Sequence, residues 1–188
     1  QGRRREGFYS VINLLAPRPV GQYLAWRQDT TWVQLKYEFV AAGVPHVLDH
    51  TFVTFYDFDS TRELTAECIM FGTDGVAYIA TAAHTELVEI NSTGVSAAYG
   101  GAMSAFAASL PASGSDQSVY CASQDGVGTD NPASPAELTH TQEARSIMIE
   151  LRNVSSFDVV FAIAPCCSTA RNFLMAGYSN LTSNVCPS

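Results

Sequence analysis

Apolar and polar residues alternate with a period of two along much of the chain, a pattern typical of β-strands that bury one face. The clearest case is residues 31–40. Their apolar positions are Val33, Leu35, Tyr37 and Phe39, separated by Gln34, Lys36 and Glu38. Residues 50–58 are apolar on both faces and rich in β-branched and aromatic residues, which predicts a central strand. These runs limit the chain to a β-rich fold.

Shorter apolar runs bounded by turn residues predict further strands. The runs are residues 67–71, 76–80, 86–90, 147–152, 157–164 and 172–177. The tetrapeptide Gly72-Thr73-Asp74-Gly75 predicts a hairpin between the first two runs, and residues 153–156 are expected to join the fourth and fifth as an antiparallel pair. Residues 102–110 lie in an Ala-, Ser- and Gly-rich stretch and fit a helix or a strand; we expect a strand.

One short helix is expected between Pro135 and Ala144, because two helix-starting signals occur there. Residues 134–137 and 139–142 both have the spacing of a capping box. About ten short strands, a single helix and no strand–helix–strand spacing predict an all-β fold. We expect an antiparallel two-sheet β-sandwich that resembles a jelly roll in its number of strands.

The 188 residues fit one domain, since no internal repeat and no linker rich in Pro or Gly divides them. We expect a single sandwich domain over residues 1–188, with an N-terminal arm over residues 1–12 and a C-terminal tail over residues 178–188. No apolar run approaches the ~20 residues that a helix needs to cross a bilayer, so we predict no membrane span.

The charge of the chain excludes two classes of partner. The net charge is −8, and the basic residues are nine arginines and one lysine, Lys36. No extended basic face is therefore expected for nucleic acid or anionic lipid. The one basic run, residues 3–5, is expected to be a solvated terminus.

Three N-glycosylation sequons begin at Asn91, Asn153 and Asn180. Such tripeptides are used only where oligosaccharide transfer occurs, and the acceptor must lie on an exposed loop or strand edge. Their coincidence with five cysteines predicts a protein that is secreted and extracellular.

The five cysteines are Cys68, Cys121, Cys166, Cys167 and Cys186. We expect a disulfide between Cys68 and Cys121, and a second between Cys186 and either Cys166 or Cys167, because adjacent cysteines do not easily bond each other. An odd count leaves one thiol, which is either buried and free or bonded to another chain of a homo- or hetero-oligomer. A zinc site is disfavoured because the chain has no CxxC.

Two carboxylates, Asp57 and Asp59, stand at the end of the predicted strand 50–58. Their spacing of two places both on one side, where the sheet meets solvent. Carboxylates held so close favour a cation, and calcium prefers hard oxygen ligands of this kind. The polar loop of residues 123–134 offers three further ligands, namely Asp125, Asp130 and Asn131. The sequence therefore predicts a calcium site.

This calcium site does not have the spacing of an EF-hand, because Arg62 stands where that motif requires glycine. The alternative is that Asp57 and Asp59 cap a turn or form an ion pair with Arg62.

Enzymatic motifs are missing from the sequence: it has no GxSxG, no HExxH and no glycine-rich phosphate loop after a strand. The four histidines, His46, His50, His84 and His140, are scattered. A glycoside hydrolase requires only two suitably spaced carboxyls, and Asp57 or Asp59 opposite Glu67 or Asp125 would supply such a pair. We expect no enzymatic activity.

Carbohydrate binding is the stronger alternative, because sandwich domains bind sugars with exposed aromatic rings supported by acids or amides. The candidate rings are Trp26, Trp32, Tyr99, Tyr120 and Tyr178. Against this interpretation, most aromatic residues of a sandwich fill the space between its sheets.

Several short patterns carry a family resemblance. They are residues 54–59 (TFYDFD), Glu67-Cys68, the 130–132 loop (DNP) leading to Leu138 and Gln142, residues 145–147, Ser156-Phe157 and residues 171–174 (RNFL). The chain resembles, over about residues 30–177, an uncharacterised family of extracellular β-domains in surface and secreted proteins of algae and protists. The resemblance implies a secreted β-rich module in which Asp57, Asp59 and Asn131 share a site.

The sequence as a whole predicts a secreted, glycosylated structural or adhesive module. We expect it to assemble with other subunits into an extracellular filament, coat or matrix, stabilised by calcium.

Overall fold

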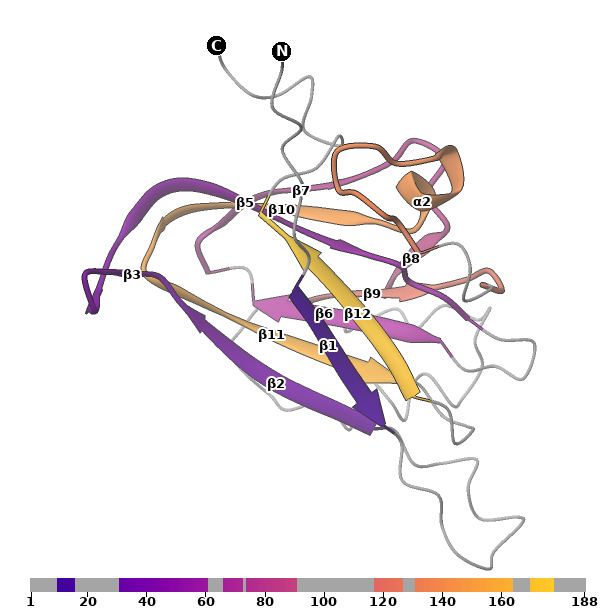
Figure 1. The fold of residues 1–188 in the computed structure, drawn as a ribbon, viewed down its shortest axis with the longest axis horizontal. Helices are drawn as coiled ribbons and strands as arrows, with labels where there is room; N and C mark the ends of the chain where they lie inside the picture. The colour runs from indigo at the N-terminus through magenta and orange to yellow at the C-terminus, as the bar shows by residue number, and fades with distance from the viewer. Residues whose placement is uncertain are drawn as a thin grey trace, which may run out of the picture.

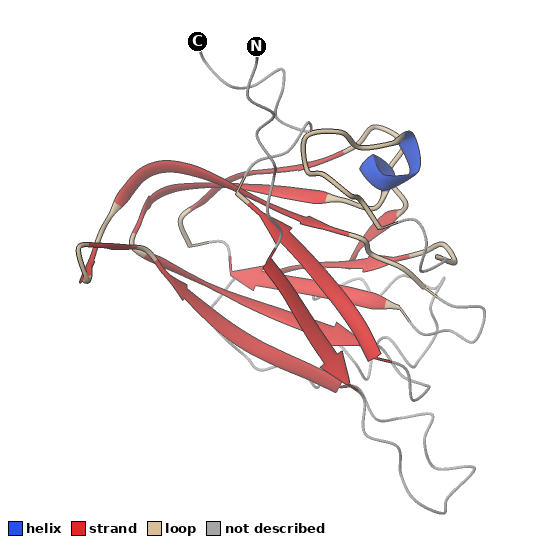
Figure 2. Ribbon diagram, in the orientation of Figure 1, coloured by secondary structure: helices blue, strands red, loops and turns tan. Residues whose placement is uncertain are grey.

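The structure is a computed structural model that describes residues 10–15, 31–60, 66–72, 74–90, 117–126, 131–163 and 170–177. Two five-stranded antiparallel sheets pack on each other (Figures 1 and 2), which confirms the predicted sandwich. Sheet A has the order β1 (Ser10–Leu15), β12 (Ala170–Ala176), β5 (Leu48–Tyr56), β10 (Ile147–Val154) and β7 (Val76–Thr81). Sheet B has the order β2 (Thr31–Glu38), β11 (Ser156–Ile163), β6 (Glu67–Gly72), β9 (Gln117–Ala122) and β8 (Leu87–Ile90). A two-stranded ribbon pairs β3 (Val40–Ala41) with β4 (Val44–Pro45).

The strand order is that of a jelly roll with two insertions. When the β3–β4 ribbon and the strands β7 and β8 are set aside, eight described strands remain. Sheet A contains the first, eighth, third and sixth of them, and sheet B the second, seventh, fourth and fifth. This interleaving places strands far apart in sequence side by side, as in double-sheet jelly rolls. The inserted β7 and β8 add one edge strand to each sheet, beside β10 and β9 respectively.

The main core lies between the two sheets and is built around aromatic rings. Phe161 of β11 lies 5.7 Å from Phe55 of β5 and 4.9 Å from Phe173 of β12, measured between ring centroids. All three side chains are at most 1% exposed. Burying a side chain of this size contributes about 1.5–3 kcal/mol, so these contacts stabilise the packing of the two sheets.

Two strands lie within two residues of their predicted bounds, one predicted from its period of two and one from its two apolar faces. In β2, Val33, Leu35 and Tyr37 pack against the core, whereas the residues between them are exposed. The strand expected over residues 50–58 is β5, the middle strand of sheet A, which confirms that it is central.

Both predicted strand pairings are wrong, because the two strands of each predicted pair lie in different sheets. The tetrapeptide at 72–75 joins β6 of sheet B to β7 of sheet A, and residues near Asn153 join β10 of sheet A to β11 of sheet B. These connections are arches between the sheets. The turn residues and the apolar runs are the same for an arch as for a hairpin, so the local sequence does not separate them.

One hairpin was not predicted. The β3–β4 ribbon turns at Ala42 and Gly43, whose φ values of 51° and 80° are both in the left-handed region that two-residue hairpin turns of type I′ require. Ala42 is unusual in this conformation, which is why the sequence gives little signal for the turn.

The helix α2 (His140–Ala144) is shorter than expected. Its capping box is formed by Thr139 and Gln142, as predicted. The earlier signal at Ser134 forms a turn instead, in which the Ser134 hydroxyl accepts a hydrogen bond from the N–H of Ala136 at 3.2 Å. Within the described part of the chain α2 is the only helix, and it is too short to span a membrane.

Other expectations concern the ends of the chain. Because β1 begins at Ser10, the last three residues of the expected arm over residues 1–12 belong to sheet A. The expected tail over residues 178–188 and the strand expected over residues 102–110 lie outside the described residues.

Candidate functional site

The predicted carboxylates lie at one end of the sandwich, where the chain leaves β5 and enters β6. Asp57, Asp59 and Glu67 are 9%, 5% and 2% exposed. We expected Asp57 and Asp59 to face solvent on one side of a strand, but β5 ends at Tyr56 and Asp57 has a φ of 68°. The strand period therefore does not apply here, and the acids turn into the protein.

A buried arginine that sequence reasoning missed organises this end. Arg145 lies between α2 and β10, and its side chain is 9% exposed. Its Nη1 donates to Asp59 Oδ1 at 2.8 Å, its Nε to Glu86 Oε2 at 2.7 Å and its Nη2 to the Asp125 carbonyl at 2.9 Å. Arg145 therefore links three separate segments. Each of these hydrogen bonds has a charged donor, and such bonds are stronger than those between neutral groups.

Backbone hydrogen bonds hold the same segments together. The N–H of Phe58 donates to Arg145 O at 3.3 Å, and that of Ser60 to Gln124 O at 2.9 Å. The N–H of Gly126 donates to Ser60 O at 3.2 Å. The positions of the charged side chains are therefore fixed by the chain around them.

Gly126 packs directly on the Asp59 carboxylate. A Cβ placed at Gly126 would lie 1.8 Å from Asp59 Cγ and 1.8 Å from its Oδ1. Only glycine leaves room for this approach. The loop is thereby pressed against the carboxylate that Arg145 binds.

Glu67 of β6 lies beside a second arginine, Arg171 of β12, so this contact connects the two sheets. Glu67 Oε2 accepts the N–H of Asp59 at 3.0 Å, and Glu67 Oε1 lies 3.6 Å from Arg171 Nε. This nitrogen is buried and has no hydrogen-bond partner among the described residues. Burial raises the pKa of Glu67 well above its usual value. The Asp59 N–H and Arg171 lower this pKa in part, whereas the nearby Asp59 and Asp57 carboxylates raise it further.

The described members of the predicted calcium site do not gather as ligands. Asp59 binds Arg145, Asp125 contributes its carbonyl to Arg145 and accepts a long 3.5 Å bond from the Ser60 hydroxyl, and Asn131 is exposed. Within the described ranges no group of three or more His, Cys, Asp or Glu side chains is placed to hold a metal. The charged group beside Asp59 is the Arg145 guanidinium. Asp130 and Arg62 lie outside the described residues, so calcium binding stays a prediction.

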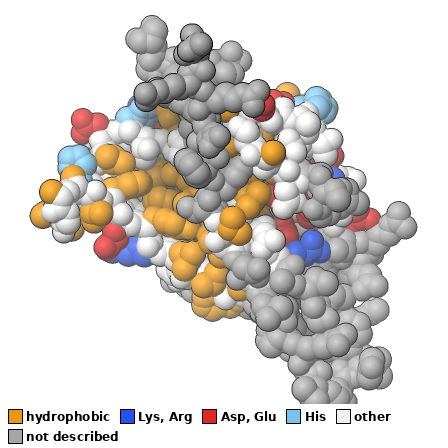
Figure 3. Space-filling view, in the orientation of Figure 1, with side chains coloured by type: hydrophobic (Ala, Val, Ile, Leu, Met, Phe, Trp, Pro, Cys, Tyr) orange, Lys and Arg blue, Asp and Glu red, His pale blue; other side chains and the backbone are white. Residues whose placement is uncertain are grey.

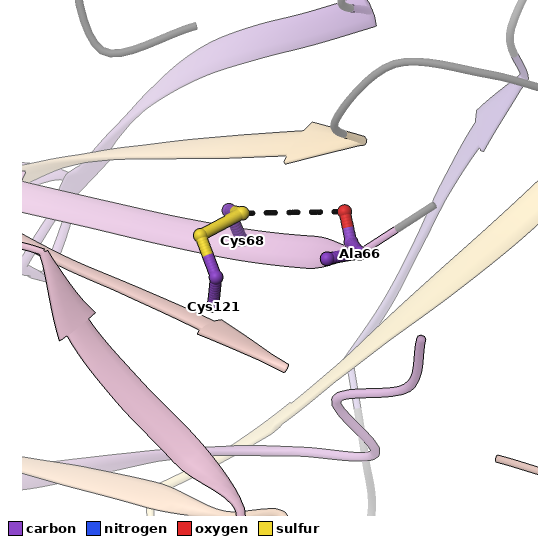
Figure 4. The surroundings of a disulfide bond; sticks show 3 residues. All are labelled: Ala66, Cys68 and Cys121. Carbon is purple, nitrogen blue, oxygen red and sulfur yellow. Dashed lines mark hydrogen bonds between the residues drawn. A yellow bond between two sulfur atoms is a disulfide. The ribbon is translucent and has the colours of Figure 1, made fainter. Parts of the chain in front are cut away.

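The expected disulfide between Cys68 and Cys121 is present, with an S–S distance of 2.06 Å (Figure 4). The two residues are directly opposite each other on β6 and β9. Their side chains lie on the outer face of sheet B, in a second buried apolar cluster that includes Met70, Ile90 and Val160. Cys166, Cys167 and Cys186 lie outside the described residues, so the second disulfide and the unpaired thiol stay predictions.

Of the three sequons, the structure describes the one at Asn153. This residue is exposed, has a φ of 53° and is the second-last residue of β10, next to the arch that leads to β11. It therefore meets the accessibility that glycosylation requires. Asn91 and Asn180 lie outside the described residues.

The aromatic candidates for sugar binding divide between surface and core. Trp32 is 41% exposed, but Tyr120 is 8% exposed and stacks on Phe71 in the core, so it is not a binding platform. Burial and the neighbouring Glu89 raise the pKa of Tyr120 to about 12. Trp26, Tyr99 and Tyr178 lie outside the described residues.

Two of the histidines meet, although they are far apart in the sequence. The rings of His84 and His140 stack with centroids 3.5 Å apart, and His84 Nε2 lies 2.9 Å from the His140 carbonyl. This contact ties the turn before β8 to the first residue of α2.

Comparison with protein-family models, with curated proteins and with solved structures found no match for this chain.

Proposed function

We propose that this protein is a secreted structural or adhesive module that assembles with other subunits into an extracellular filament, coat or matrix. The observation that supports this most is the β3–β4 hairpin, which projects from one end of the sandwich and is apolar (Figure 3). Its residues Val40 and Val44 are 61% and 63% exposed, and the following Val47 is 56% exposed. Apolar residues grouped on a projection in this way are typical of interaction sites.

The hairpin is held in a fixed position, which suits a contact surface. Its base is joined to the sandwich by the N–H of Phe39, which donates to Ser155 O at 2.8 Å. The N–H of His46 donates to Phe39 O, also at 2.8 Å, and closes the hairpin. A preorganised apolar projection loses little conformational entropy when it enters a pocket of a second subunit.

Two observations support the extracellular location. A disulfide such as Cys68–Cys121 persists in oxidising compartments, and the Asn153 sequon is exposed. The acids at the opposite end of β5 are engaged by Arg145 and Arg171, which favours a stabilising role for them over a catalytic one.

The size of the protein in solution tests this proposal. We expect non-reduced protein from a secretory host to associate at micromolar concentrations in multi-angle light scattering. The double variant Val40→Ser, Val44→Ser is expected to be monomeric, because it removes the apolar contact without changing buried residues. Val11→Ser is the matched control, since Val11 is 58% exposed on β1.

A wild-type protein that stays monomeric up to ~100 µM would contradict assembly, because specific subunit contacts commonly reach micromolar affinity or better. Association that is equally weakened by Val11→Ser would assign the contact to a different surface. A covalent oligomer that disappears on reduction would show that the unpaired cysteine contributes as well.

A further inference from the structure

The outer face of sheet A carries an exposed aromatic and charged surface that the predictions did not include. It consists of His50 and Phe52 on β5, Glu150 and Arg152 on β10, and Tyr78 on β7, and we call these five residues the Tyr78 patch. The three strands are neighbours in the sheet (Figure 1). Val53 and Phe55 of β5 point into the core, so the alternating residues His50 and Phe52 point outward.

The register of the strands places the five residues in two adjoining rows. Arg152 is directly opposite His50, and Glu150 lies between Phe52 on one side and Tyr78 on the other. Glu150 Oε1 is 3.0 Å from His50 Nε2 and 2.5 Å from Arg152 Nε. The rings of His50 and Phe52 meet edge to face with centroids 4.6 Å apart. The patch is therefore a connected set of side chains.

The polar groups of the patch are held in place and yet accessible. The side chains of His50 and Arg152 are 39% and 59% exposed, and Tyr78 is 53% exposed, whereas the Glu150 side chain is only 7% exposed. The nearly buried carboxylate thus fixes two solvent-facing polar side chains, His50 and Arg152. In the next row of the same face Thr54 and Met148 are fully buried, so the open surface ends there.

We propose that the Tyr78 patch binds a neutral saccharide. The C–H face of a pyranose ring stacks on the exposed Tyr78 ring, while its hydroxyls accept from the Arg152 guanidinium and donate to Nδ1 of the neutral His50 imidazole, whose Nε2 faces Glu150. Because the contacts with Glu150 hold both side chains before binding, little side-chain entropy is lost.

The charges of the patch and of the whole chain select the class of sugar. Arg152 and Glu150 balance when the His50 imidazole is neutral, and the chain carries a net charge of −8. Sulfated and uronate polymers are therefore repelled at long range, and a neutral glycan is not. This inference rests on the proposed adhesive function, and it names neutral glycans as the class of ligand to which the module adheres.

Binding to soluble oligosaccharides tests the proposal. The probes are gluco-, manno-, galacto- and xylo-oligosaccharides, with a sulfated galactan and an oligouronate as charged probes. We expect at least one neutral probe to bind with a Kd of about 1 mM or tighter by calorimetry or NMR titration. Tyr78→Ala is expected to weaken this binding at least about tenfold, and Tyr78→Phe less than about threefold, because Phe keeps the ring.

Trp32→Ala is the matched control, since Trp32 is an exposed aromatic residue on an edge strand of the other sheet. Its binding is expected to equal that of the wild type. Arg152→Gln is a second variant on the patch and is expected to weaken binding about tenfold, as loss of a charged hydrogen bond does. Melting temperatures of all variants show whether each remains folded.

Three results would overturn the proposal: no neutral probe binds, only the charged probes bind, or binding survives Tyr78→Ala in a folded variant. The assembly experiment is separate, because the hairpin and the Tyr78 patch share no residue. Val40→Ser, Val44→Ser is expected to keep sugar binding, and Tyr78→Ala is expected to keep assembly. Failure of one proposal is therefore distinguishable from failure of the other.

Discussion

Arg145 shows how one buried side chain can organise the acids at the end of the sandwich. It contacts Asp59, Glu86 and the Asp125 carbonyl from a position that is nearly buried. In the sequence it is only a basic residue after a short helix, 86 positions from Asp59 in the chain. Nothing local indicates that fold topology brings the two together, whereas the Asp57–Asp59 spacing was visible and suggested calcium.

Replacement of Arg145 tests which cation stabilises this end. Arg145→Met is expected to lower the free energy of unfolding by about 3–5 kcal/mol, because it leaves the Asp59 carboxylate buried without its partner. If calcium binds as the sequence predicts, EDTA is expected to lower the melting temperature of the wild type by several degrees. Lys36→Met is the matched control, since its ion pair with Glu38 is more than half exposed and contributes at most about 1 kcal/mol.

A fall of several degrees on chelation would show that calcium does bind the protein. A small effect of Arg145→Met would show that the end of the sandwich does not depend on this ion pair. Thermal and denaturant unfolding, with and without EDTA, distinguish these results.

Glu67 predicts a dependence of stability on pH. Because burial raises its pKa in the folded state, the folded protein keeps a proton there that the unfolded chain releases. This contribution to stability is complete below the usual pKa of 4.5 and is lost as the pH rises through the raised value. Glu67→Gln imitates the protonated form, so its stability relative to the wild type is expected to increase as the pH rises.

Denaturant unfolding of both proteins between about pH 4 and about pH 9 measures this difference. Glu38→Gln is the control, because Glu38 is 56% exposed on β2. A difference between Glu67→Gln and wild type that does not change with pH would contradict the assignment.

At the scale of the elements, the end of β5 is closed by the loop that contains Gly126. Gly126→Ala places a methyl group on the Asp59 carboxylate and is expected to cost about 1–3 kcal/mol, as overpacking does. Gly72→Ala is the matched control, because no atom lies within 4 Å of a Cβ there. Equal melting temperatures for the two variants would show that the loop moves away from Asp59 freely.

The sequence predicted where the strands lie better than which strands pair with each other. The alternation in residues 31–40 identified the half-buried strand β2, and the two apolar faces of residues 50–58 identified the central strand β5. Both patterns depend only on local residues. The arches at 72–75 and near Asn153 were mistaken for hairpins. Arches and hairpins use the same turn residues, and they differ only in whether the two strands lie in one sheet or in two. The Tyr78 patch was missed for the same reason, as it joins residues of three strands.

At the scale of the whole molecule, the net charge of −8 opposes the assembly that the apolar hairpin favours. Raising the ionic strength from about 10 mM to about 150 mM shortens the screening length from about 30 Å to about 8 Å. We therefore expect self-association to strengthen with salt. Weaker association at higher salt, measured by sedimentation, would show that opposite charges and not apolar side chains form the contact.

The disulfide has a consequence for the integrity of the chain. Cys68 and Cys121 are 53 positions apart, and the inserted strands β7 and β8 lie within the covalent ring that they close. A protease that cuts one bond inside this ring opens it without releasing a fragment, so the two pieces migrate apart only after reduction. The eight jelly-roll strands thus stay on one covalent framework even when the insertion is nicked.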